Sequence, residues 1–283
     1  MSEGALTYVD PRVLLKRHGL TASRRYSQNF LISRHVLEAI AEATCEGAAP
    51  AVVELGAGLG TLSAELMRRG CRVLAIERDP RMLEVLRAEL VPAGLKLQPG
   101  DAAHVDYRAA ATELGATPRV VGNLPYAITG AILRDLIEAC EFIERAVIMV
   151  QREVAERLLA DPGSGQYGAL SVFTQAAFAI ERVVKAPPTA FHPPPRVHSQ
   201  VLRLRPLSPP RAQETPALRA TVRAAFQGRR KTLLNALSTL GPKDAVAQAL
   251  RACDIDAQRR GETLAVEDFA RLAQALQEGG IWG

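Results

Sequence analysis

The sequence predicts an α/β fold in which helices cover both faces of a parallel sheet, followed by a small all-helical C-terminal domain. Up to Val150, short apolar runs alternate with stretches of helical periodicity. The runs are almost continuously apolar, which is typical of strands buried on both faces. Beyond Pro216 the periodicity is helical throughout. A chain of 283 residues is long enough for one large domain with a smaller companion.

Five strands and the helices between them are predicted in the first domain. The strands are predicted at 51–55, 72–76, 95–97, 119–122 and 146–150. Helices are predicted at 34–44 after a Ser33 cap, after Gly60, at 80–90 with Pro80 in the first turn, and at 129–139. Because ligands bind at the carboxyl ends of parallel strands, the polar residues that follow these strands are expected to share one edge of the sheet.

The second half of the chain begins with two further extended stretches, at 180–185 and 197–204. Between them lies a proline-rich loop at 186–195, whose prolines exclude a helix or a central strand. A proline-rich linker at 206–216 separates the domains, which are predicted to span 1–207 and 208–283. The helices of the second domain are predicted at 217–227, 229–240, 243–252 and 267–277. Residues 1–27 form a basic N-terminal segment whose order without a partner the sequence leaves open.

The composition is that of a globular protein with a weak preference for polyanionic partners. The net charge is +5, and arginine supplies nearly all of the positive charge. Arginine favours bidentate phosphate contacts and stacking on bases. A compositional bias of the genome explains the same excess of arginine equally well.

Metal sites, disulfides and membrane spans are not expected. The four cysteines are widely spaced without a CxxC pair, and the five histidines add no ligand spacing. The N-terminus has no basic region followed by an apolar one, and no apolar run approaches membrane-spanning length. A cytoplasmic protein without a metal, acting as a monomer, is therefore predicted.

A glycine-rich loop follows the first predicted strand and is the first candidate binding element. Gly56 and Gly58 allow a tight turn and close approach of a ligand to the backbone, and Gly60 lets the next helix begin nearby. The spacing alone is a weak signal, and the GKS or GKT of a nucleoside triphosphatase is absent from the sequence. Glu54 precedes the loop and, with Gly56, suits the amino-acid end of a cofactor.

Two carboxylates end the next two predicted strands. Glu77 is positioned to accept hydrogen bonds from both ribose hydroxyls of an adenosine cofactor, and Asp101-Ala102 to accept one from the adenine amine. Each acid taken alone is equally well explained as a solvated strand end. Together with the glycine loop they favour S-adenosylmethionine, which carries no phosphate. A nicotinamide dinucleotide is disfavoured because no His or Tyr-Lys pair for hydride transfer is evident.

The segment Asn123-Leu124-Pro125-Tyr126 follows the fourth predicted strand and is the candidate catalytic element. Asn123 Oδ1 and the Leu124 carbonyl are suited to accept the two N–H bonds of an adenine amine, which favours a pyramidal nitrogen with its lone pair toward the methyl donor. Pro125 biases Leu124 to an extended backbone. Tyr126 offers a stacking face for the base. An ordinary turn between a strand and a helix is the alternative.

Further residues are candidates for contact with a base or a nucleic-acid backbone. Phe191, in the proline-rich loop, is predicted to form a second stacking face opposite Tyr126, with an anchoring role in the core as an equal alternative. Two basic clusters are predicted to bind RNA, Arg24-Arg25 near the N-terminus and Arg229-Arg230-Lys231 in the second domain. A solvated helix end or intramolecular pairing explains the second cluster as well.

These motifs, in this order, resemble the ribosomal RNA adenine N6-dimethyltransferases, and most closely the bacterial small-subunit members. The resemblance covers roughly residues 15 to 277. It rests on Gln28-Asn29-Phe30-Leu31, Glu54 to Gly60, Glu77, Asp101, Asn123 to Tyr126, Phe191 to Ser199, Arg229 to Lys231 and Gly261 to Leu264. It implies a Rossmann-like methyltransferase domain that uses S-adenosylmethionine, releases S-adenosylhomocysteine, and methylates two adjacent adenosines near the 3′ end of 16S ribosomal RNA, each twice.

The resemblance also implies roles for individual residues. The cofactor-binding set is Gln28, Asn29, Leu31, Glu54, Gly56, Gly58, Glu77, Arg78, Asp101, Ala102 and Asn123. Asn123, Leu124 and Tyr126 are expected to hold the target adenine, with Phe191 opposite. One departure is Ser27, where the family usually has glycine, so the entry of that loop is expected to differ without loss of activity.

Two other functions remain open on the same fold. The 23S ribosomal RNA methyltransferases behind macrolide resistance share the methyltransferase motifs, but the proline-rich loop and the sequence after 216 favour the small-subunit enzymes. A non-catalytic RNA-binding assembly factor is disfavoured because the segment at 123–126 and the cofactor residues are intact.

Overall fold

The computed structural model describes residues 7–23, 25–47, 50–228 and 230–281, which divide into two compact units. The first unit comprises Met1–Ala155 and Ile180–Pro206, and the second Glu156–Ala179 and Leu207–Gly283. The predicted α/β fold with a helical C-terminal part is confirmed. The segment 156–179, expected in the first domain, groups with the helical unit because the apolar side chains of its helix pack against the C-terminal helices.

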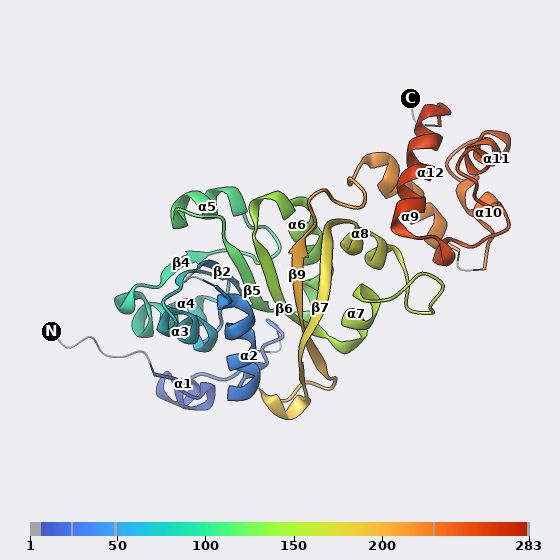
Figure 1. Ribbon diagram of the computed structural model, residues 1–283. Coiled ribbons are helices and arrows are strands. Elements are labelled where there is room, and N and C mark those ends of the chain that lie inside the picture. The colour runs from blue at the N-terminus through green and yellow to red at the C-terminus, as the bar shows by residue number, and fades with distance from the viewer. Residues whose placement is uncertain (1–6, 24, 48–49, 229, 282–283) are drawn as a thin grey trace. The chain divides into compact units, whose positions relative to one another are not determined.

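A seven-stranded sheet runs through the first unit in the order β4-β3-β2-β5-β6-β9-β7 (Figure 1). Strands β2 to β6 pair in parallel, and β9 lies antiparallel to β6. The strands are β2 (Ala51–Leu55), β3 (Arg72–Glu77), β4 (Lys96–Pro99), β5 (Arg119–Asn123), β6 (Arg145–Gln151), β7 (Phe178–Ala186) and β9 (Ser199–Pro206). All five strands predicted for the parallel part are present.

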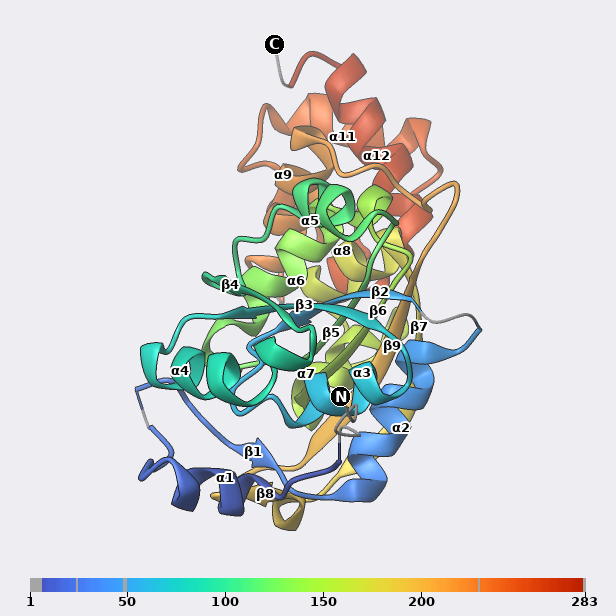
Figure 2. The ribbon, with the colours of Figure 1, turned by 90° about the vertical axis from the view of Figure 1, so that its left-hand side faces the viewer.

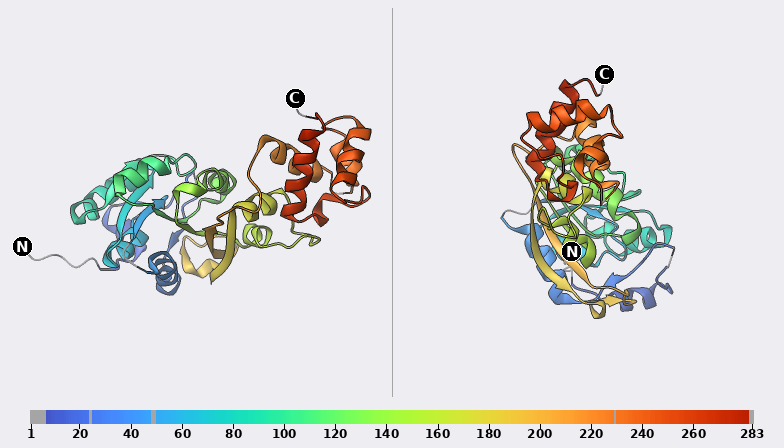
Figure 3. Two further views of the ribbon diagram at one scale, coloured as in Figure 1. Left: turned by 45° about the horizontal axis from the view of Figure 1, so that its top comes forward. Right: turned by 90° about the vertical axis from the view of Figure 1, so that its right-hand side faces the viewer.

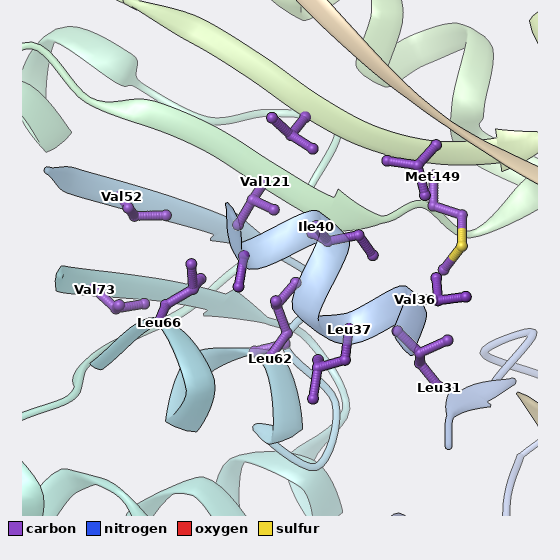
Figure 4. Packing of buried hydrophobic residues seen from close by; sticks show 14 of the residues in the cluster. Leu31, Val36, Leu37, Ile40, Val52, Leu62, Leu66, Val73, Val121 and Met149 are labelled. Carbon is purple, nitrogen blue, oxygen red and sulfur yellow. The ribbon is translucent and has the colours of Figure 1, made fainter. Parts of the chain in front are cut away.

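Helices cover both faces of this sheet. Figures 1 and 2 show α2 (Arg34–Cys45), α3 (Thr61–Arg68) and α4 (Pro80–Glu89) on one face, and α5 (Tyr107–Leu114) and α6 (Thr129–Glu138) on the other. Side chains along a strand alternate between the two faces. Figure 4 shows one of the two layers, in which alternate strand residues pack against α2 and α3; its labelled members include Val52, Val73, Val121, Leu37, Ile40, Leu62 and Leu66.

Part of the N-terminal segment is helical, which the sequence had left open. Helix α1 (Pro11–Arg17) begins at Asp10, whose carboxylate accepts a hydrogen bond from the Arg12 amide. Leu14 and Leu15 of this helix are buried in a small cluster with Phe30, Leu59, Met82 and Val85. A two-stranded ribbon of β1 (Phe30–Leu31) and β8 (Phe191–His192), which the sequence did not predict, follows in the same unit.

The second unit is built from helices (Figure 3). They are α8 (Ala169–Ala177), α9 (Pro216–Phe226), α10 (Leu233–Leu237), α11 (Lys243–Ala252) and α12 (Val266–Glu278), with α7 (Arg152–Leu158) crossing the boundary between units. Phe226 packs between Tyr167 and Phe269, with ring centroids 6.1 and 5.8 Å away. The chain's described portion contains no helix long and apolar enough to span a membrane.

The helix predicted at 229–240 is shorter than expected. Only Leu233–Leu237 is helical, and the described residues Arg230 and Lys231 lie in an irregular turn before it. The amides of Leu233 and Leu234 donate to the carbonyls of Arg259 and Ala257 instead of to a preceding helical turn. These tertiary bonds satisfy the first amides of α10, so the helix begins there.

Candidate active site

A cavity in the first unit is lined by residues from the carboxyl ends of β2, β3 and β5. The strand order reverses between β2 and β5, and ligands of doubly wound sheets bind in the crevice at that position. The lining includes fourteen of the predicted residues: Arg25, Gln28, Asn29, Leu31, Glu54, Gly56, Gly58, Glu77, Arg78, Ala102, Asn123, Leu124, Pro125 and Tyr126. Segments far apart in the sequence thus meet at one edge of the sheet.

The glycine loop forms a sharp turn between β2 and α3. The Gly56 amide donates to the Ile76 carbonyl at 2.8 Å, which holds the loop against β3. Gly60 has φ +77°, and a Cβ there would lie 2.4 Å from Leu90 Cδ1 and 2.7 Å from Leu86 Cδ2. Gly60 therefore permits both the backbone conformation and the close packing of the loop on α4.

Backbone amides hold the Glu77 carboxylate at the end of β3. Oε2 accepts the Gly58 amide at 2.8 Å, and Oε1 accepts the amides of Arg78 and Asp79 at 2.8 Å each. A carboxylate oxygen has two acceptor sites, so Oε2 retains one for a ligand. The same side chain thus fixes the glycine loop and presents an acceptor to the cavity.

Glu54 is a second, more deeply buried acid in the cavity wall. It is 3% exposed, and the Ser63 hydroxyl donates to its Oε2. Burial, opposed by the Ser63 hydrogen bond and reinforced by the Glu77 charge, raises the pKa of Glu54 to about 8. Desolvation disfavours the ionised carboxylate, so Glu54 holds its proton at neutral pH in the ligand-free protein.

A chain of hydrogen bonds orients the Asn123 amide. Asn123 Nδ2 donates to the Asn29 carbonyl at 3.0 Å, and Asn29 Nδ2 donates to the Ser27 carbonyl at 3.2 Å. Within the described ranges no donor bonds to Asn123 Oδ1, and Asn123 lines the cavity. Ser27 adopts φ +52°, in the left-handed region that favours glycine. Ser27 thus adopts a backbone conformation in which glycine would be less strained.

The segment after Asn123 is a braced turn into α6. The Leu124 amide donates to the Met149 carbonyl at 3.1 Å, and the Pro125 carbonyl accepts the Ile128 amide at 3.1 Å. The Tyr126 hydroxyl lies 2.8 Å from Ser199 Oγ, so β9 anchors the ring. The Leu124 carbonyl accepts no hydrogen bond from the described donors. This turn therefore holds its backbone and its ring in place before any ligand is bound.

Two of the residues predicted for the cofactor or the target base, Phe191 and Asp101, do not line the cavity. Phe191 is 2% exposed and packs in the core between the sheet and α2, where β8 pairs with β1. This burial matches the anchoring role that was the alternative to a stacking face. Asp101 accepts the Ala103 amide and forms an ion pair with Arg78 at 3.0 Å, while its neighbours Gly100 and Ala102 line the cavity.

The predicted RNA-binding residues belong to both units. Arg25 lies over the Tyr26 ring, with its guanidinium carbon 5.7 Å from the ring centroid. Arg78, which was predicted to bind the cofactor, lies over the same ring at 5.4 Å. In the second unit, Arg230 and Lys231 are exposed. Arg24 and Arg229 lie outside the described residues. Over the described ranges, no three His, Cys, Asp or Glu side chains gather as a metal site would require.

Sequence reasoning missed several residues of the cavity wall. They are Tyr26, Ser27, Leu37, Ile40, Thr61, Leu62, Ile76, Gly100, Ala127 and Ile128. The apolar members lie on helix faces or at strand ends. An apolar residue at such a position fits the same sequence periodicity whether its side chain faces the core or a ligand. Tyr26 was within reach of prediction, because it is an aromatic residue that directly follows the Arg24-Arg25 cluster.

The chain matches known proteins over nearly all of its length. Residues 19–278 match the family described as ribosomal RNA adenine dimethylase. A protein of Myxococcus xanthus named ribosomal RNA small subunit methyltransferase A is 45% identical over 273 residues, covering 94% of this chain and 95% of the relative. A relative of the same name from Anaeromyxobacter is 45% identical over 282 residues, covering 95% and 98%.

Solved structures share the fold. A dimethyladenosine transferase from Plasmodium falciparum superposes with a TM-score of 0.75 at 24% identity, covering 89% of this chain and 98% of its own. The 23S rRNA methyltransferase ErmE superposes with a TM-score of 0.63 at 29% identity, covering 88% and 100%. The predicted family and the predicted enzyme class are confirmed. This chain belongs to the ribosomal RNA adenine dimethylase family.

Proposed function

We propose that this enzyme transfers methyl groups from S-adenosylmethionine to N6 of two adjacent adenosines near the 3′ end of 16S ribosomal RNA, two to each, during maturation of the small subunit. The names of its relatives support the small-subunit substrate. The orientation of the Asn123 amide carries the proposal, because it presents an acceptor to the cavity at the end of β5.

The residues of the cavity fit S-adenosylmethionine. Glu77 offers its remaining acceptor to a ribose hydroxyl, and the turn at Gly56 brings the backbone close to the ligand. Glu54 suits the ammonium group at the amino-acid end of the cofactor, because a nearby cation favours the ionised form of the carboxyl group. Ala102 lines the cavity where the adenine of the cofactor would lie, and Asp101 precedes it, paired with Arg78. When bound, the cofactor supplies a methyl group already activated on a sulfonium.

The target adenine amine is held by two acceptors. Asn123 Nδ2 donates to the Asn29 carbonyl. The Asn123 Oδ1 atom is therefore the part of the amide that can accept a hydrogen bond from an N–H donor. The Leu124 carbonyl is the second acceptor, on a peptide whose amide is bonded to Met149. Accepting both N–H bonds turns the nitrogen lone pair out of conjugation and toward the methyl donor.

Positioning accounts for most of the catalysis. The methyl donor is strongly electrophilic, so the protein needs to hold the nitrogen in line with it rather than to supply a strong base. The product ammonium loses its proton readily. Tyr126, anchored by Ser199, offers a stacking face worth about 1–3 kcal/mol to a base extruded from folded RNA. A second stacking face from Phe191 would require its buried side chain to leave the core.

Incubation with labelled S-adenosylmethionine and undermethylated 30S subunits, followed by nucleoside analysis, tests the proposal. N6,N6-dimethyladenosine in 16S ribosomal RNA is the expected product. Undermethylated 50S subunits serve as the parallel substrate, since the structure of ErmE shares this fold. Methylation of 23S ribosomal RNA alone, or of neither RNA, would reject the assignment.

The proposed partners follow from this substrate. The RNA backbone is contacted by Arg25 at the cavity and by Arg230 and Lys231 in the second unit, with Arg24 and Arg229 next to them in sequence. The enzyme acts as a monomer in the cytoplasm, where small subunits are assembled.

A further inference from the structure

Two of the four cysteines are neighbours in the first unit, although they are distant in sequence. Cys45 is the last residue of α2, and Cys71 directly precedes β3. Their sulfur atoms are 3.0 Å apart, so one thiol donates to the other. This contact lies at the start of β3, whereas the cavity residue Glu77 lies at its other end. The mechanism proposed above uses neither thiol.

The surroundings make the two thiols chemically different. Cys71 is 6% exposed and packs in the core cluster, while Cys45 is half-buried. The hydrogen bond from Cys71 lowers the pKa of the Cys45 thiol against the effect of burial, and the guanidinium groups of Arg69 and Arg119 lower it further. The same hydrogen bond and burial raise the pKa of Cys71. Cys45 is therefore the thiol that ionises first.

Arg119 is held in place beside this pair. Its Nη1 donates to the carbonyls of Thr44 and Glu46, which flank Cys45, at 2.7 and 2.9 Å. Its guanidinium also pairs with Glu144 at 2.8 Å. A fixed cation next to a thiol favours the thiolate, which is the reactive form of cysteine.

A small oxidant has a route to the pair. Cys71 lines a surface depression together with Met67, Gly70, Arg72 and Gly94. Cys45, whose sulfur lies 3.0 Å from that of Cys71, is itself a partly exposed residue. Reactive cysteines that respond to oxidants share this combination of partial access, thiolate character and a second thiol within reach.

We propose that Cys45 and Cys71 form a reversible redox site that closes to a disulfide on reaction with a peroxide. The Cys45 thiolate attacks the peroxide, the O–O bond breaks, and a sulfenic acid and hydroxide form. Cys71 then attacks the oxidised sulfur, the S–O bond breaks, and water leaves as the disulfide forms. The two cysteine sulfurs lose two electrons, and the peroxide gains them.

The cross-link encloses the part of the chain that builds the cofactor cavity. The segment between the two cysteines contains β2, the glycine loop and α3. Closing it restricts the unfolded chain and is expected to raise the melting temperature of the first unit. Because both sulfurs lie away from the carboxyl ends of the strands, methyl transfer is expected to continue in the oxidised protein.

The full-length protein, treated with hydrogen peroxide and then alkylated under denaturing conditions, provides the test. The expected result is a mass loss of about 2 Da, two unalkylated cysteines and a cross-linked Cys45–Cys71 peptide, all reversed by dithiothreitol. The Cys140→Ser/Cys253→Ser variant is the matched control and should give the same result. Cys45→Ser should give no cross-link.

A further variant tests whether Cys45 is the thiol that reacts with the peroxide first. In Cys71→Ser, the sulfenic acid on Cys45 has no partner and should be trapped by dimedone. Full alkylation of both thiols after peroxide treatment, or dimedone labelling at another cysteine alone, would overturn the redox site. A cross-linked protein whose melting temperature is unchanged or lower would overturn the stabilising role.

Discussion

At the residue scale, the proposed chemistry depends on which way one amide points. Asn123 offers a donor and an acceptor, and only the acceptor suits an adenine N–H bond. The Asn29 carbonyl accepts from Nδ2 and so selects the orientation, across 94 positions of sequence. Asn29 is in turn bonded to the Ser27 carbonyl. The loop at 27–29 therefore acts as a positioning device for the active-site amide.

Replacing Asn123 tests this orientation. Asn123→Ala is expected to lower the single-turnover rate of methyl transfer by about 100-fold or more, the usual cost of removing one hydrogen-bonding group aimed at the reacting atoms. RNA affinity should change little. Asn123→Asp keeps the acceptors but cannot donate to the Asn29 carbonyl, so it should be impaired as well. A wild-type rate in Asn123→Ala would show that Asn123 takes no part in the mechanism. If Asn123→Ala is impaired but Asn123→Asp keeps the wild-type rate, the hydrogen bond to the Asn29 carbonyl is not required.

The backbone of Ser27 provides a second residue-scale prediction. A non-glycine residue in the left-handed region costs about 1–2 kcal/mol, and a β-branched residue is least tolerated there. Ser27→Val should therefore destabilise the loop relative to Ser27→Gly by about that amount and slow methyl transfer through Asn29. Ser27→Gly should retain the wild-type rate. Equal rates and equal thermal stability of the two variants would show that the loop does not depend on this conformation.

At the element scale, the candidate functional residues lie in turns, whereas the strands form the core of the fold. In the proposed function, the turn from β5 into α6 holds the target adenine. The turn before α10 exposes Arg230 and Lys231. Tertiary hydrogen bonds to Arg259 and Ala257 keep the second turn from being absorbed into a longer helix. Exposed cations on an irregular segment are free to follow a phosphate backbone.

Neutralising the described cations of that turn tests their role in RNA binding. Arg230→Gln/Lys231→Gln should weaken binding of 16S ribosomal RNA and reduce the slope of log affinity against log salt by about 1.4–1.8, because each released counterion contributes about 0.7–0.9. Lys243→Gln/Arg251→Gln removes the same charge from exposed positions of α11 in the same unit and serves as the control. An equal loss of slope in both variants would assign the effect to net charge alone.

At the scale of the whole molecule, a cavity with two buried carboxyl side chains, Glu54 and Glu77, lies in a chain of net charge +5. Under the proposed function, the positive charge suits an RNA substrate, while Glu54 and Glu77 suit a cationic cofactor. Burying Glu54 without a ligand has a cost, because its pKa is raised to about 8 from a usual value of 4.5. The folded state therefore holds one more proton than the unfolded state between these two values.

The free energy of unfolding should depend on pH, because the folded state binds this extra proton. Since the folded pKa is the higher one, the free energy of unfolding is expected to fall as pH rises from about 4.5 to 8, by at most about 1.4 kcal/mol per unit. Hydrogen exchange of the β2 amides measures this for the first unit. Glu54→Gln, which stays neutral, should remove the decline. The same decline in both proteins would mean that another group is responsible.

The sequence by itself determined the parallel strands, the glycine loop, the strand-end acids and the family. Each of these features can be predicted from residues that are close in the sequence, because apolar runs, glycine spacing and short motifs are local patterns. It also placed Glu77 and Asn123 at one edge of the sheet, because the carboxyl ends of parallel strands share an edge.

Only the tertiary structure decided what those residues touch. It buried Phe191 in the core, paired Asp101 with Arg78, oriented Asn123 through Asn29 and brought Cys45 to Cys71. It also grouped the helix α8 with the C-terminal helices. Each of these three pairs joins residues more than twenty positions apart. The helix grouping depends on which apolar face is buried. Local periodicity carries no record of such partners, since the same pattern serves a core, a pocket or an interface.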